Sequence, residues 1–218
     1  MLPSTNTNSL HNGRAFYVAV PKDQAEEFRL TYDYPEFTEA FASDLVGDTI
    51  SLTARYNRKT AAIEIILGEE LREIDGAQIP VIFIGSNTYI YVQQGDEKGI
   101  SGSFAKLAAQ SADGQYAAAH FFTVKQASNI PPQRGISSQK PKTVSLDSTA
   151  HLLGLRPLAV ELPRNKSRLI KDLSACERAA FESLRRYKPR KTSYLQELCE
   201  VLSTDCSNKE KAELRPSN

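Results

Sequence analysis

Residues 48–56, DTISLTARY, alternate between apolar and polar side chains, and this period of two constrains the fold more than any other feature of the chain. One side of the segment carries Ile50, Leu52, Ala54 and Tyr56. A polar NRK at 57–59 leads into a second apolar segment, TAAIEIIL at 60–67. Two such segments joined by a short polar turn are typical of a β-hairpin. We therefore expect an antiparallel pair of strands across 48–67.

The flanking sequence predicts further strands and three helices. Strands are expected at 15–20, 79–85, 88–94 and 115–125. Helices are expected at 21–30, 34–46 and 101–112, the first two because a proline stands near the first helical position. Most strands are joined by short turns, and the helices lie between hairpins. This order is typical of an α+β fold with a mainly antiparallel sheet and two or three helices, followed by a linker and a small helical C-terminal region.

Charge is divided unevenly along the chain, although the net value is only +1. Residues 1–124 hold 9 Lys or Arg against 16 Asp or Glu, whereas residues 125–218 hold 18 against 10. An acidic half and a basic half favour two surfaces with different partners, and the basic half would attract nucleic acid or another anionic surface. Alternatively, the two halves neutralise one another within the molecule.

Composition divides the chain into four predicted parts. These are a disordered tail at 1–13, an acidic α+β domain at 14–126, a linker at 127–167 and a basic helical region at 168–218. The acidic domain is expected to form a homodimer or to hold a protein partner. Within the linker, the apolar stretch 151–163 is expected to dock as an extra strand on the first domain or against a partner. Its candidate protein-binding residues are Leu152, Leu153 and Leu155.

Two capping-box patterns mark the starts of two C-terminal helices. Ser174 and Ser193 are each followed, three residues later, by a Glu or Gln whose side chain would reach back to the first residue of the box. We therefore expect helices at 175–187 and 194–203, each with an apolar stripe that needs a packing partner. Pro189 lies between them and prevents one continuous helix.

The segment from Ser174 onward resembles the start of a helix-turn-helix or winged-helix unit. Its first helix ends in Arg-Arg-Tyr, its second is SYLQELCEVL, a turn follows at 203–205, and a polar third helix is expected at 206–214. The resemblance implies a DNA-binding function in which the third helix enters the major groove.

The segment 185–191, named here the basic joint, holds five positive charges in seven residues and no acid. Clustered Lys and Arg side chains contact phosphates and bind nucleic acid with a strong dependence on salt. The candidate nucleic-acid-binding residues are Arg185, Arg186, Lys188, Arg190, Lys191, Lys209, Lys211 and Arg215. We expect a non-enzymatic, modular nucleic-acid-binding protein, with DNA favoured over RNA.

Two other interpretations of the basic joint stay open. The cations can complement the dipole at the end of a solvated helix without binding any ligand. The helical hairpin can also serve an adaptor or inhibitor that binds another protein without nucleic acid. In that case the apolar stretch 151–163 and the hairpin would form the contact surface.

Catalytic and metal-binding patterns are scarce. His11, His120 and His151 are far apart in the sequence, which disfavours a zinc site. The segment GISGS at 99–103 only approaches the G-x-S-x-G pattern of a serine nucleophile, and no sequence rule pairs Ser101 with His120. We expect no cofactor, no metal and no enzymatic activity.

Cysteine usage bears on the compartment. Cys176, Cys199 and Cys206 are an odd number and form no CxxC pattern, so a disulfide framework is not expected. Cys176 and Cys199 are expected to be small apolar core residues. Neither the N-terminus nor the longest apolar runs have the pattern of a signal peptide or a membrane span. A cytoplasmic protein without a membrane partner is the resulting expectation.

Overall fold

The structure, a computed structural model, describes residues 22–43, 49–67, 70–96, 99–126, 144–154, 158–169, 173–184 and 186–213. Its strands are β1 (Thr38–Ser43), β2 (Thr49–Asn57), β3 (Ala62–Leu67), β4 (Glu70–Glu73), β5 (Val81–Ile84), β6 (Asn87–Asp96), β7 (Gly99–Gln110), β8 (Ala117–Gln126), β9 (Val144–Leu153) and β10 (Val160–Leu162). Its helices are α1 (Lys22–Thr31), α2 (Lys166–Leu169), α3 (Ala175–Ser183) and α4 (Thr192–Glu213). The segments predicted at 1–13 and 15–20 lie outside the described residues.

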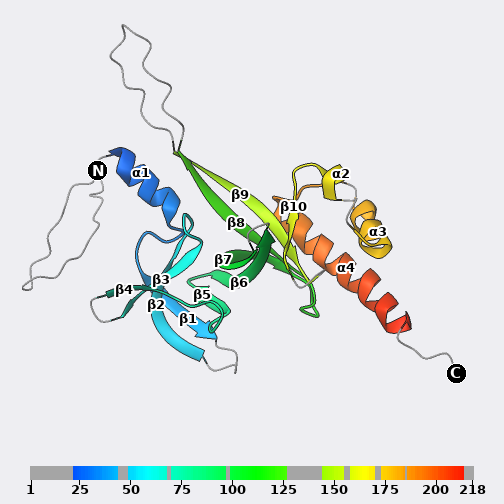
Figure 1. Cartoon of the computed structure of the whole chain (residues 1–218), viewed down its shortest axis with the longest axis horizontal. Coiled ribbons are helices and arrows are strands. Elements are labelled where there is room, and N and C mark those ends of the chain that lie inside the picture. Colours follow the sequence, from blue (N-terminus) through cyan, green and yellow to red (C-terminus); the bar gives the residue numbers. More distant parts are fainter. Residues whose placement is uncertain are drawn as a thin grey trace, which may run out of the picture.

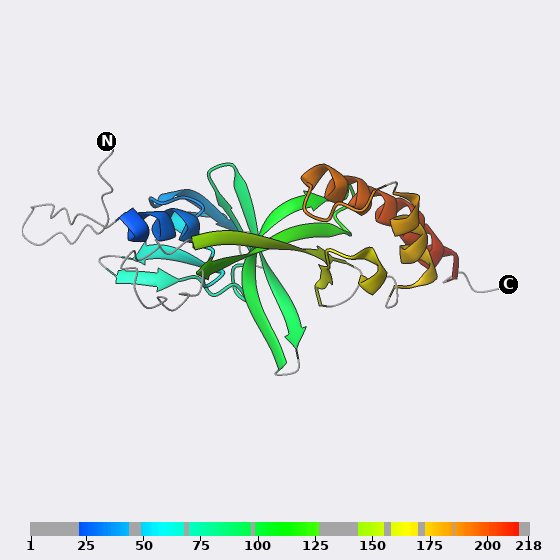
Figure 2. The same cartoon turned by 90° about the horizontal axis from the view of Figure 1, so that it is seen from above.

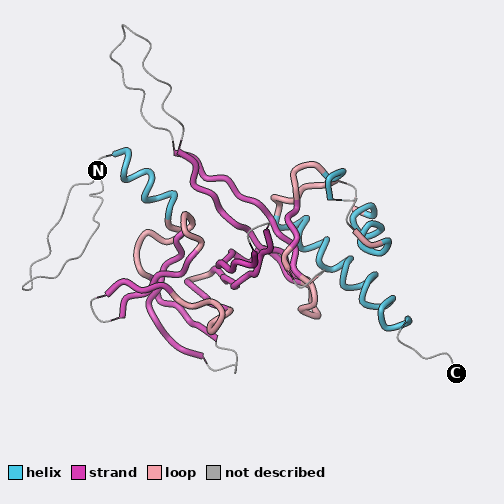
Figure 3. The backbone as a smooth tube through the Cα atoms, in the orientation of Figure 1, coloured by secondary structure: helices cyan, strands magenta, loops and turns pink. Residues whose placement is uncertain are grey.

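Over the described residues, the strands form one antiparallel sheet in the order β10-β9-β8-β7-β6-β5-β1-β2-β3-β4 (Figure 1). Helices lie at the two ends of the molecule and strands occupy the space between them (Figure 3). The hairpins predicted at 48–67 and 79–94 are confirmed as β2–β3 and β5–β6. The helix predicted at 21–30 is confirmed as α1, and the strand predicted at 115–125 is confirmed as β8.

The predicted fold class, α+β, is wrong, because the described chain is mainly β. Two of the predicted helices are strands. The segment predicted as a helix at 34–46 contains β1, in which Ala40 and Ala42 are buried while Phe41 between them is half-exposed. This alternation follows the period of a strand, and pairing on both sides with β2 and β5 outweighs the helical spacing of its aromatic residues.

The second misassigned helix, 101–112, is most of β7. Its Ala and Leu residues favour a helix locally, but the segment pairs with β6 on one side and β8 on the other. Gly102 explains part of this placement, because a Cβ atom there would lie 1.9 Å from the hydroxyl oxygen of Tyr91 on β6. A glycine inside a strand often marks such a close approach.

The part of the sheet formed by β1–β6 is curled. We call this part, together with α1 and the first part of β7, the curled half; it comprises the described residues of 22–106. The backbone N–H of Phe104 on β7 donates to the carbonyl oxygen of Ala61, before β3, at 2.8 Å. The Tyr56 hydroxyl donates to the Phe104 carbonyl oxygen at 2.9 Å. The core inside the curl consists of Ala40, Ala42, Ala54, Tyr56, Ile63, Ile82, Ile84, Tyr89 and Phe104.

A buried polar network fixes the connection between α1 and β1. The Asp33 carboxylate accepts hydrogen bonds from the Tyr89 hydroxyl at 2.5 Å and Lys106 Nζ at 2.9 Å, and it pairs with Arg58. Asn87 also donates to it at 3.2 Å. Burial alone would raise the pKa of the Asp33 carboxyl, but the donors Tyr89 and Lys106 and the charge of Arg58 hold that pKa below its usual value.

The described residues of 107–213 form the second part of the molecule, which we call the helical half. Figure 2 shows its helices gathered at the end of the sheet opposite α1. The apolar stripes of α3 and α4 pack on β7, β8 and β9, where Phe181, Leu195, Leu198 and Leu202 are fully buried. Residues 144–153, predicted as linker, are β9, and part of the apolar stretch 151–163 forms the edge strand β10.

The two predicted capping boxes have different outcomes. Ser174 accepts from the Glu177 N–H, and the Glu177 side chain accepts from the Ser174 N–H at 2.6 Å, so this box is confirmed at the start of α3. Ser193 lies inside α4, and the Gln196 side chain instead donates to the Gln110 carbonyl oxygen at 2.8 Å. The second box is therefore wrong.

Helix α4 is one continuous helix of 22 residues that includes the turn predicted at 203–205. The predicted end of the second helix and the separate third helix are therefore wrong. The resemblance to helix-turn-helix units stays a prediction, without the turn on which it was based.

A disulfide joins Cys176 on α3 to Cys206 on α4, whereas Cys199 is a free, buried thiol. The expectation of a chain without disulfides is therefore wrong, and Cys199 alone is a simple core residue. None of the helices in the described ranges is long and apolar enough to cross a membrane. The cytoplasmic location stays a prediction, and it loses one of its reasons, because disulfides persist mainly in oxidising compartments.

Candidate anion-binding interface at the basic joint

The basic joint connects α3 to α4 and is anchored by its uncharged residues. The Tyr187 hydroxyl donates to the Pro163 carbonyl oxygen at 2.6 Å, and its ring meets the Tyr194 ring edge-on at 5.7 Å. Pro189 is buried. The Lys191 N–H donates to the Lys188 carbonyl oxygen at 2.9 Å, which closes a turn. The backbone is thereby held in place while the charged side chains between the anchors stay exposed.

A hollow of about 630 Å³ opens between the joint and the first turn of α4. Its lining residues are Ser183, Leu184, Arg186, Lys188, Lys191, Ser193, Tyr194 and Glu197. Within the described ranges, the three exposed cations of this set form no ion pair. Glu197 brings one carboxylate to the same lining, so three cations and one anion leave a net charge of +2 in the hollow for a ligand.

The start of α4 adds to the positive potential of the hollow. The first turn of a helix has N–H groups without an intrahelical acceptor, and its dipole favours a nearby anion. Ser193 and Tyr194 of this turn line the hollow. The Tyr194 hydroxyl is buried without a hydrogen-bond partner among the described residues, and burial raises its pKa, so it stays protonated. The hollow therefore combines cations with a helix start.

Arg190 leaves the hollow and extends to the sheet. Its Nη2 lies 2.6 Å from the Asp147 carboxylate on β9, which also accepts from Lys125 on β8 at 3.0 Å and from Arg164 at 3.2 Å. The Lys125 donor, the Ser148 N–H and the charge of Arg190 lower the pKa of the Asp147 carboxyl to about 2. Asp147 is thus ionised at neutral pH and ties the joint to the β8–β9 hairpin.

The structure brings together only part of the predicted nucleic-acid-binding set. Arg186, Lys188 and Lys191 converge on the hollow, and Arg190 is adjacent. Arg185 and Arg215 lie outside the described residues. Lys209 and Lys211 belong to the last turns of α4, and at a rise of 1.5 Å per residue Lys209 is about 27 Å from Lys191 along the helix. They do not join the hollow.

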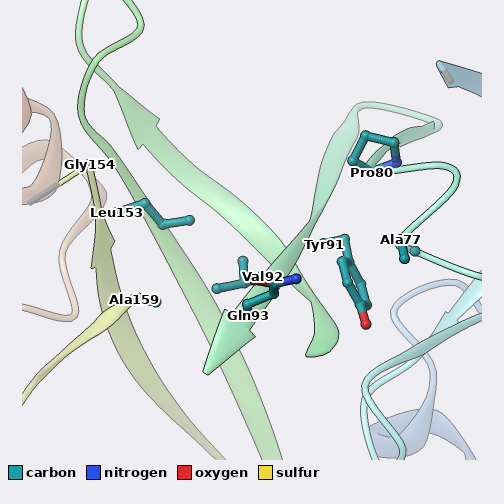
Figure 4. A pocket seen from close by; sticks show the side chains of 9 residues that line it. Ala77, Pro80, Tyr91, Val92, Gln93, Leu153, Gly154 and Ala159 are labelled. Atoms are coloured by element: carbon teal, nitrogen blue, oxygen red, sulfur yellow. The ribbon is translucent and has the colours of Figure 1, made fainter. Parts of the chain in front are cut away.

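The predicted protein-binding leucines are mostly unavailable. Leu152 is fully buried against α4 in the protein's own core. Leu153 is half-buried and lines a shallow hollow of about 390 Å³, where Figure 4 shows it across from Tyr91 and Pro80. Leu155 lies outside the described residues. Burial of Leu152 by the chain itself removes it as an anchor for a partner.

The residues considered for catalysis are not assembled. In the antiparallel pairing of β7 with β8, His120 stands opposite Lys106, about 17 Å along the strand from Ser101 at 3.3–3.4 Å per residue. Burial lowers the pKa of His120 and raises the pKa of the Cys199 thiol to about 12, so both are neutral at pH 7.

Comparison of the chain with family models, curated proteins and solved structures gave no significant match.

Three contributors to the surface were missed from the sequence: Lys125, Asp147 and Arg164. They flank or lie in a segment predicted to be a linker on its content of Pro, Ser and basic residues. The alternation of Val144, Leu146 and later Ala150 and Leu152 was the available signal of a strand.

Proposed function

We propose that this protein binds nucleic acid by contacting backbone phosphates at the basic joint. The supporting observation is the convergence of Arg186, Lys188 and Lys191 on one hollow at the start of α4. Phosphate oxygens are strong acceptors that suit Arg and Lys donors and helix N-termini. We propose DNA rather than RNA as the ligand only because the sequence resembles helix-turn-helix units.

Salt dependence of binding tests this proposal. A fluorescence anisotropy titration would compare the full chain with the triple variant Arg186→Gln, Lys188→Gln and Lys191→Gln, using labelled duplex DNA. Loss of three phosphate contacts should reduce the slope of log affinity against log salt by about 2.7. When the salt is diluted fourfold, the increase in affinity of the variant should therefore be about 40-fold smaller than that of the parent. Duplex and single-stranded RNA are the comparison probes.

A charge-matched control separates local contacts from net charge. Arg29→Gln, Lys59→Gln and Arg72→Gln remove the same charge from exposed or mostly exposed positions of the curled half. This variant should keep nearly the slope of the parent. Equal losses in both triple variants, or no salt-dependent binding by the parent, would contradict a nucleic-acid site at the joint.

A second candidate function, binding of a protein partner, is favoured by the outer surface of the curled half. Phe41 and Phe83 are paired in register on β1 and β5 and are 44% and 43% exposed. Ile66 and Leu71 are paired on β3 and β4 and are even more exposed. Grouped apolar side chains on a surface often mark protein contacts. By contrast, the stripes of α3 and α4 are used inside the protein, so the hairpin offers little apolar surface.

Self-association is the simplest form of this second function. Sedimentation of the parent should show a dimer that Phe41→Ser with Phe83→Ser converts to a monomer. Leu67→Ser, which changes an exposed apolar residue at the end of β3, is the control and should stay dimeric. A parent that is monomeric at every concentration would exclude this form.

A further inference from the structure

The single carboxylate of Asp147 pairs with three cations and neutralises only one of their three charges. Lys125, Arg164 and Arg190 all pair with its carboxylate, and they come from β8, from the segment after β10 and from the basic joint. Their side chains are 59%, 74% and 47% exposed. We call these four residues the Asp147 cluster. One carboxylate and three cations leave a net charge of +2 at a solvent-exposed position.

The two arginines keep donors for a further acceptor. An Arg side chain has five N–H donors, and both Arg164 and Arg190 reach Asp147 through Nη2 only. Asp147 restricts where these long side chains lie, which lowers the entropy that a ligand must remove on binding. The cluster therefore presents preorganised cations with unused donors.

The Asp147 cluster is continuous with the hollow at the joint. Arg190 belongs to the cluster, and Lys191, the next residue, lines the hollow. Their Cα atoms are about 3.8 Å apart, as in any trans peptide. A phosphate chain bound at the hollow would thus have the cluster as its neighbour, on the side of the β8–β9 hairpin.

We propose that the Asp147 cluster is a second phosphate-binding position, which contacts the same nucleic acid as the hollow and extends the interface from α4 onto the β8–β9 hairpin. This assignment rests on the proposed function. Asp147 acts in it as an internal carboxylate that positions the cations and competes weakly with a phosphate for them.

Two variants of the full chain test the cluster with labelled duplex DNA as the probe. Lys125→Gln with Arg164→Gln should reduce the log–log salt slope by about 1.8, or about 12-fold in the affinity gained on fourfold dilution of salt. Asp147→Asn should bind more tightly than the parent, because it raises the local charge from +2 to +3 while the Asn amide oxygen can still accept a hydrogen bond from the arginines and keep them in position. Arg29→Gln with Arg72→Gln is the charge-matched control, and melting curves check that each variant is folded.

The outcomes separate this assignment from the proposed function. If the double variant keeps the slope of the parent while the triple variant at the joint loses it, the joint binds nucleic acid and the cluster does not. Weaker binding by Asp147→Asn would also overturn the assignment, because the cluster would then serve only to tie the joint to the sheet. Loss of slope in the double variant together with tighter binding by Asp147→Asn supports it.

Discussion

The two halves of the molecule use charge in opposite ways. In the curled half, Arg55 pairs with Glu64 and Arg58 with Asp33, and all four side chains are no more than 14% exposed. Arg55 is also enclosed by aromatic rings, with its guanidinium 3.9 Å from the centre of the Tyr32 ring. In the helical half, the described cations of the basic joint and of the Asp147 cluster are exposed, and they share one carboxylate or form no ion pair among the described residues.

This difference separates structural charge from charge available to a ligand. A buried ion pair must be complete, since an uncompensated charge in the interior is costly. Exposed pairs contribute little to stability, so their residues are free to serve binding. We infer that the curled half pairs its buried charges internally, and we propose that the helical half supplies the interface.

The largest expected loss of stability follows from removing the disulfide of the helical half. The disulfide Cys176–Cys206 closes a loop with a sequence separation of 30. Removing it by Cys176→Ser with Cys206→Ser should lower the free energy of unfolding by about 3.6 kcal/mol on the loop-entropy relation. Urea denaturation with and without reductant measures this effect. Reductant should destabilise the parent and leave the double variant unchanged; an unaffected parent would mean that the bond is not formed.

The next largest loss of stability follows from changing the buried polar network of the curled half. Asp33→Asn leaves Arg58 and Lys106 without their counter-charge and should destabilise the protein by about 3 kcal/mol. The matched change in the helical half, Asp147→Asn, should leave the urea midpoint nearly unchanged, because its partners are exposed. Equal destabilisation by the two variants would remove the distinction between the halves.

Acid should reveal part of the same contribution. The folded pKa of Asp33 is below its usual value of 3.8, so its contribution to stability is fully present above pH 3.8 and is lost as the pH falls through the lower, folded pKa. Below pH 3.8, the free energy of unfolding of the parent should fall more steeply with acid than that of Asp33→Asn. A parent that becomes relatively more stable in acid would mean that the folded carboxyl is protonated.

The smallest effect compares two serines within the helical half. Ser174 caps α3 with both bonds of the capping box, so Ser174→Ala should cost about 1 kcal/mol. Ser193 lies inside α4 and makes no such cap, so Ser193→Ala should be close to neutral. Thermal melting of the two variants decides the matter. Equal losses would mean that α4 begins at the capping box seen in the sequence.

Local sequence rules succeeded where local pairing decides the structure. The hairpins β2–β3 and β5–β6, the cap at Ser174 and the clustered cations of the basic joint all follow from short-range patterns. The rules failed for β7, where pairing with β6 and β8 and the approach of Tyr91 to Gly102 override helix propensity. Neighbouring strands, not the segment itself, decide such cases.

The candidate site shows the same limit. Five clustered charges and Pro189 were enough to locate the joint. The meeting of Arg190 with Asp147 joins residues 43 apart in the sequence and depends on the position of α4 on the sheet. The continuous course of α4 through 203–205 could not be predicted from the polar turn-like composition there, because Leu202 and Cys206 on its buried face hold it down.

Hydrogen–deuterium exchange of the full chain with and without duplex DNA tests the separation of the two halves most directly. We predict slower exchange on DNA binding for the backbone amides of the basic joint and the first turn of α4. Amides of β8 and β9 near Asp147 should also be protected, and those of β1–β5 should be unchanged. Protection on β1–β5, with none at the basic joint, would contradict the account, because it would place the interface on the curled half.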